Sequence, residues 1–162
     1  MDVTSFWRLI GEAKAESGGE CEREVELLRD KLIALSPEEI VEFHNILTQF
    51  RRQAYSHDLW AAAYIINGGC SDDCFDYFGA WLIAQGEEVY SNTLRDSETL
   101  AEVARFEQVE CESLLSGAAE AYEEKTGEQM PHAPRGEWAL GGEEWDEETV
   151  YEKYPRLAQK FS

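Results

Sequence analysis

The stretch DLWAAAYIINGGCSDD, residues 58–73, decides the fold class of this chain. Its first part, Leu59–Ile66, is apolar on every side, as in a helix enclosed by its neighbours. The turn residues 67–69, Asn-Gly-Gly, tolerate positive φ and end a helix, and Ser71 followed by two acids is typical of the start of the next one. The stretch therefore predicts a tight junction between two helices, the first of which we expect to be the central helix.

Helical spacing of apolar residues continues on both sides of this junction. Ser36-Pro37-Glu38-Glu39 has the form of a capping box with proline in the first turn. Further periodic segments begin near Ser5, Glu22, Val89 and Asp96, and the last of these keeps helical spacing as far as Thr126-Gly127. Alternation long enough for a confident strand is missing. We predict an all-α single domain over residues 1–162, with about six to eight helices in a bundle-like array.

The periodicity breaks between residues 128 and 148, where prolines and glycines are spread among Trp138, Leu140 and Trp145. Tryptophans gain much by lying on a core, so we interpret this segment as an irregular strap packed on the helices. The alternative is that its tryptophans anchor a partner. A last short helix is expected over 149–154 or after Pro155.

The formal charge of −20 excludes several partners. Such a field repels nucleic acid phosphates and anionic lipid heads, so direct binding to nucleic acid or membrane is not expected. No apolar run reaches the ~18 residues of a membrane span, and the N-terminus does not resemble a signal peptide. We expect a cytoplasmic protein whose four cysteines, Cys21, Cys70, Cys74 and Cys111, are reduced thiols.

The junction is also the best candidate for a ligand or functional site, because thiols, carboxylates and a hydroxyl gather at a helix start. The candidate residues are Asp58, Asn67, Gly68, Gly69, Cys70, Ser71, Asp72 and Asp73. Each also has a structural explanation, as turn glycine, cap or small apolar residue, and Asp58 in particular fits a helix cap. One C-x3-C pair is too little for a structural zinc site, so neither a metal nor a cofactor is predicted.

The chain resembles a known family at several motifs. These are the stretch 58–73 with Phe75, Tyr77-Phe78, Trp81-Leu82-Ile83 and Gln85-Gly86, the opening Phe6-Trp7-Arg8-Leu9-Ile10, and the late Tyr122-Glu123 and Thr126-Gly127. They are similar to the uncharacterised bacterial domain-of-unknown-function family 4240. Cys74 departs from the small residue expected after the two acids. The resemblance implies no established activity, cofactor or partner.

Two functions compete at this level. The first is a non-catalytic binding or regulatory module whose acidic surface meets a basic protein. Its candidate contact residues are Trp138, Glu143, Glu144, Trp145 and Asp146. The second is an enzyme or small-ligand binder with its site at the Asn67–Asp73 junction. A structural subunit is a third possibility.

Overall fold

A computed structural model describes residues 1–104, 109–131 and 138–161, and its regular elements are all helical. They are α1 (Val3–Ser17), α2 (Cys21–Ile33), α3 (Pro37–Gln53), α4 (His57–Asn67), α5 (Asp72–Ala84), α6 (Glu87–Arg95), the 3-10 turn η1 (Ser97–Thr99), α7 (Leu100–Val103), α8 (Leu114–Thr126), α9 (Val150–Lys153) and α10 (Pro155–Phe161). The all-α prediction is confirmed. The expected six to eight helices are too few, since the described residues form ten α-helices.

Two breaks account for part of the higher helix number. Ala104 has an extended backbone, and the amide of Cys111 donates to the carbonyl of Tyr77 on α5, so the chain crosses α5 where the sequence pattern predicts an unbroken helix. Phe106, part of that predicted helix, lies outside the described residues. Near the C-terminus, Tyr154 leaves the helical conformation directly before Pro155, as residues preceding proline do.

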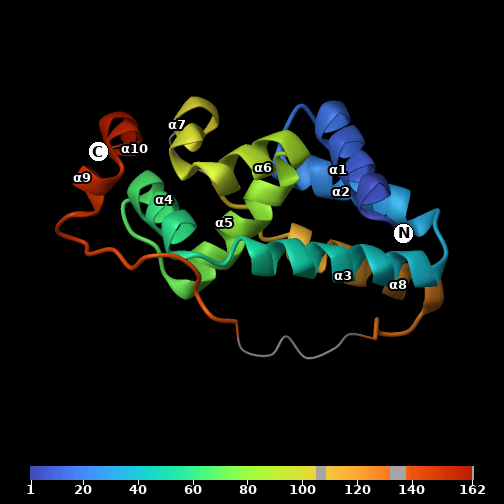
Figure 1. The fold of residues 1–162 in the computed structure, drawn as a ribbon. Coiled ribbons are helices and arrows are strands. Elements are labelled where there is room, and N and C mark those ends of the chain that lie inside the picture. The colour runs from blue at the N-terminus through green and yellow to red at the C-terminus, as the bar shows by residue number, and fades with distance from the viewer. Residues whose placement is uncertain (105–108, 132–137, 162) are drawn as a thin grey trace.

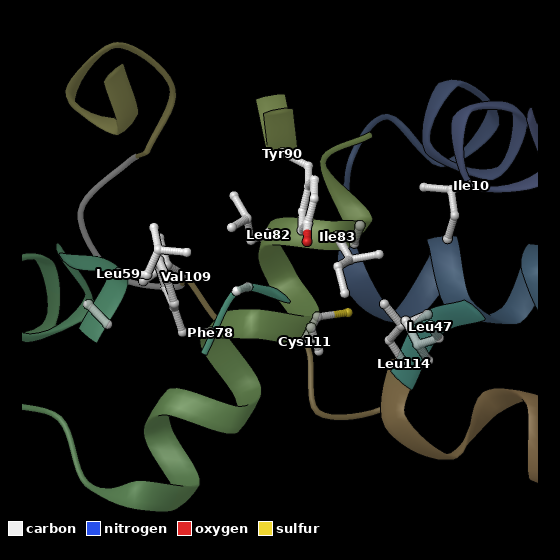
Figure 2. Close-up of a cluster of buried hydrophobic side chains, with 14 of the residues drawn as sticks. Ile10, Leu47, Leu59, Phe78, Leu82, Ile83, Tyr90, Val109, Cys111 and Leu114 are labelled. Carbon is white, nitrogen blue, oxygen red and sulfur yellow. The ribbon is translucent and has the colours of Figure 1, made fainter. Parts of the chain in front are cut away.

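The core is organised around α5 and not around α4, which the sequence suggested as the central helix. α5 contacts α1, α2, α3, α4, α6 and α8, whereas α4 packs against α5, η1, α9 and α10 (Figure 1). Phe78, Leu82 and Ile83 of α5 are fully buried. Figure 2 shows Phe78 beside Leu59 and Val109, and Leu82 and Ile83 between this group and Ile10, Leu47 and Leu114. α5 therefore joins the N-terminal helices to the group formed by α4 and α10.

The cysteines differ from the expectation of reduced thiols. Cys21, at the start of α2, is paired in a disulfide with the buried Cys111, and their Cα atoms are 5.7 Å apart. Cys70 and Cys74 form a second pair with a Cα separation of 5.3 Å. Both separations lie in the usual range for disulfides. No cysteine of the chain is free, because all four belong to described segments.

No helix in the described ranges is long and apolar enough to cross a membrane.

Candidate functional site

The junction between α4 and α5 folds as its residues predict. Gly68 ends α4 at φ 72°, and Gly69 follows at φ 134° with its amide donating to the carbonyl of Tyr64. The Ser71 hydroxyl accepts from the amide of Cys74, 3.2 Å away, and caps α5. Trp60 of α4 donates its indole N–H to the carbonyl of Cys70 at 3.0 Å. The polar groups of the turn are thus engaged in holding the two helices together.

The side chains of the remaining junction residues do not gather around a common binding site. Asp72 and Asp73 are exposed in the first turn of α5, where carboxylates favour the positive end of the helix dipole. Asn67 is exposed and donates to the sulfur of Cys74 at 3.5 Å. Within the described segments, no group of three or more His, Cys, Asp or Glu side chains could hold a metal ion. The contacts found here are those of caps and a turn.

Asp58, the remaining candidate of this set, lies at the opposite end of α4. It is nine positions from Asn67 along the helix, which corresponds to roughly 13 Å along the axis. It is not the cap of α4, as its position suggested, because the hydroxyl of Ser56 accepts from the amide of Leu59 at 3.2 Å. The Asp58 carboxylate instead accepts from the hydroxyl of Tyr154, in the turn between α9 and α10. Burial, assisted by this hydrogen bond, raises the pKa of Tyr154.

A polar cavity of about 370 Å³ opens beside the Asp58–Tyr154 contact. It is bounded by the end of α3, the start of α4, the residues from the end of α6 through η1, and α9. Arg95 and Lys153 are among its lining residues. None of the junction residues 67–73 belongs to this lining. The predicted site residues therefore lie in two separate places: residues 67–73 form a hydrogen-bonded turn, and Asp58 lines the cavity.

The strap, residues 128–148, docks on the start of α4. Gly141 accepts from the amide of His57 at 2.9 Å and donates to the carbonyl of Tyr55 at 3.1 Å. Trp145 donates its indole N–H to the carbonyl of His57 at 2.7 Å, and its ring lies 5.2 Å from that of Tyr64. Figure 1 shows this orange-red segment passing α4 on its way to α9.

Both strap tryptophans are partly buried. Trp138 lies edge-on to Tyr55, with ring centres 5.9 Å apart, and the Arg51 guanidinium lies 5.6 Å from its ring centre. Glu143 pairs with Lys153 at 3.6 Å. Other strap acids, Glu144, Asp146, Glu147 and Glu148, are exposed, and in the described parts of the chain none lies within 4.0 Å of a basic group. The aromatic side of the strap faces the protein, and carboxylates occupy its outer side.

We expect Trp145→Phe to loosen the strap, because phenylalanine keeps the ring contact but cannot donate to His57. A hydrogen bond of this kind contributes about 1 kcal/mol, so the amides of His57 and Gly141 should exchange roughly fivefold faster. Hydrogen exchange measured residue by residue checks this. Trp60→Phe is the matched control, since the indole N–H of Trp60 donates to Cys70 and not to the strap. Equal exchange in both variants would contradict the anchoring role.

Sequence reasoning did not identify Tyr154 and Arg95. Tyr154 ends the short helix predicted over 149–154 and carries no motif, and its partner Asp58 is 96 residues away. Arg95 precedes Asp96, for which the sequence predicts only a helix-capping role. Pairing of distant segments across a cleft leaves no local pattern, so the residues beside Asp58 could not be found from spacing.

Comparison with known proteins gives one match. A family model described as "Protein of unknown function (DUF4240)" matches residues 1–124. No curated protein and no solved structure matches the chain. The matched residues contain the junction and Asp58, whereas the strap and Tyr154 follow them. This match confirms the resemblance seen in the motifs, and the chain belongs to the DUF4240 family.

Proposed function

We propose that this protein is a non-catalytic binding or regulatory module that receives a basic segment of another protein on the outer side of its strap. The observation that carries the proposal is the combination of a docked strap backbone with exposed acids. Glu144, Glu147 and Glu148 project from a segment that is fixed to α4 on both sides of Glu144, through Gly141 and Trp145. A fixed backbone reduces the conformational entropy lost when a partner binds.

The charge of the whole chain supports the same interpretation. A net charge of −20 attracts basic surfaces and speeds their encounter, most strongly at low ionic strength. The strap acids would add short-range contacts to this general attraction. The alternative at the Asn67–Asp73 junction receives less support, because Ser71 and the carbonyl of Cys70 already have partners within the protein.

The test is a triple variant, Glu144→Gln/Glu147→Gln/Glu148→Gln, titrated with a fluorescent lysine- and arginine-rich peptide. We expect affinity to fall on the order of tenfold, because exposed ion pairs contribute about 0.2–1 kcal/mol each. Raising the salt from about 50 to 500 mM should weaken the wild-type complex as the Debye length shortens.

Glu38→Gln/Glu123→Gln/Glu124→Gln is the matched control, because these exposed residues of α3 and α8 lie outside the strap and the variant also changes the net charge from −20 to −17. An equal loss in both triple variants would mean that only the overall charge attracts the peptide. Salt-independent binding would count against an electrostatic surface altogether.

A further inference from the structure

The cavity beside Asp58 is built from segments far apart in the sequence. Asp58 comes from the first turn of α4, Arg95 from the end of α6, and Tyr154 from the residue after α9. Tyr154 itself is only 6% exposed, so its ring forms a wall and its hydroxyl holds the Asp58 carboxylate. A volume of about 370 Å³ lies within the roughly 300–1,000 Å³ of small-molecule pockets.

Most charged groups at this cavity already have partners in the protein. Glu98 accepts from the backbone amides of Arg156 and Leu157, and so caps the start of α10. Asp96 lies 3.4 Å from the Arg156 guanidinium. Lys153 pairs with Glu143 at 3.6 Å. These groups contribute to the structure of the cavity wall.

Asp58 and Arg95 form no ion pair among the described residues, and, unlike Glu98, neither is bonded to the backbone amides of another helix. The Asp58 carboxylate receives a hydrogen bond from the neutral hydroxyl of Tyr154. The Arg95 guanidinium donates to the neutral side-chain amide of Asn92. The two side chains line one cavity, yet among the described residues they form no ion pair within 4.0 Å of each other. A carboxylate and a guanidinium therefore face the same space without neutralising one another.

We propose that this cavity binds a small zwitterion of the free α-amino acid class. The ligand ammonium binds Asp58, and the ligand carboxylate binds Arg95, whose planar guanidinium is suited to that group. A zwitterion carries no net charge, so the negative field of the chain does not repel it as it would an anion. This site is separate from the outer side of the strap and does not depend on the proposed protein partner.

The test begins with the L-amino acids at millimolar concentration in thermal-shift assays, followed by calorimetry on the one that binds best. Its methyl ester lacks the carboxylate, and its N-acetyl derivative lacks the ammonium. We expect each derivative to bind at least tenfold more weakly, or about 1.4 kcal/mol, because each loses one charge-assisted contact. These comparisons use the wild-type protein and do not depend on the folding of any variant.

Asp58→Asn and Arg95→Gln should each weaken the same amino acid at least about tenfold. Arg52→Gln is the control, since Arg52 is exposed and does not line the cavity. The affinity of this variant for the same amino acid should stay within about twofold of wild type. Failure of every amino acid to bind would overturn the proposal. So would a methyl ester or N-acetyl derivative that binds as well as the parent, or variants at Asp58 and Arg95 that keep full affinity.

Discussion

Replacing Cys21 and Cys111 together with serine is expected to lower the free energy of unfolding by about 4.6 kcal/mol. The pair joins residues 90 positions apart, and a cross-link of that span removes a large loop-closure entropy from the unfolded chain. It ties the start of α2 to the segment before α8, and α2 and α8 share an extensive interface. Urea denaturation of the oxidised wild type and the double variant measures the difference.

The second pair supplies the control for this result. Cys70 and Cys74 are only four positions apart, so the same relation gives about 2 kcal/mol for Cys70→Ser/Cys74→Ser. Adding a reductant to the wild type should reproduce the combined loss of both pairs. If the Cys21 and Cys111 double variant unfolds at the same urea concentration as the oxidised wild type, this cross-link does not stabilise the protein.

The sequence predicts most of the helices because their signals are local. Ser36 accepts from the amide of Glu39 as a capping box requires, and Gly68 ends α4 with the positive φ expected there. The break before α8 could not be predicted in this way. Val109 and Cys111 have the apolar character of a helix face, but they are buried because the chain crosses α5. Burial in a crossing segment and burial on a helix can produce the same spacing.

The candidate site also depends on contacts between distant residues, which local sequence does not predict. The sequence favours the junction at 67–73 because its polar residues are adjacent, but adjacent polar residues are as typical of a helix cap and a turn as of a binding site. Asp58 belongs to the same predicted set, but its partner Tyr154 comes from the other end of the chain. The pairing of Cys21 with Cys111 is likewise a long-range contact, so an expectation based on compartment alone could not reveal it.

Glu24 is the one buried carboxylate among the described residues, and it makes stability depend on pH. It lies on α2 with only 2% of its surface exposed, and its Oε2 atom has no hydrogen-bond partner within the described chain. Burial raises its pKa to about 8, against an opposing effect of Lys14 on α1. Lys14 itself donates to the carbonyl of Gln85, 2.8 Å away. The folded protein therefore holds Glu24 in its neutral form at pH 7.

We expect wild type to lose stability relative to Glu24→Gln as the pH rises from 4.5 to 8. Between these values the unfolded chain has released the proton that the folded chain still holds, so the contribution of Glu24 is complete below pH 4.5 and lost by pH 8. At about 1.4 kcal/mol per pH unit, the total difference is about 5 kcal/mol. Urea denaturation of both proteins at a series of pH values measures it.

Glu26→Gln is the matched control, because Glu26 lies on the same helix, is exposed and pairs with Arg23. Its stability should follow wild type across the whole pH range to within about 1 kcal/mol, since an exposed pair contributes little. Repulsion between like charges in a chain of charge −20 also grows with pH. It lowers the stability of Glu24→Gln and Glu26→Gln alike, so it cancels when the two variants are compared. A difference between wild type and Glu24→Gln that does not change with pH would mean that Glu24 titrates normally in the folded protein. A difference that grows only between pH 4.5 and 8 therefore identifies burial of this one carboxyl group as its cause.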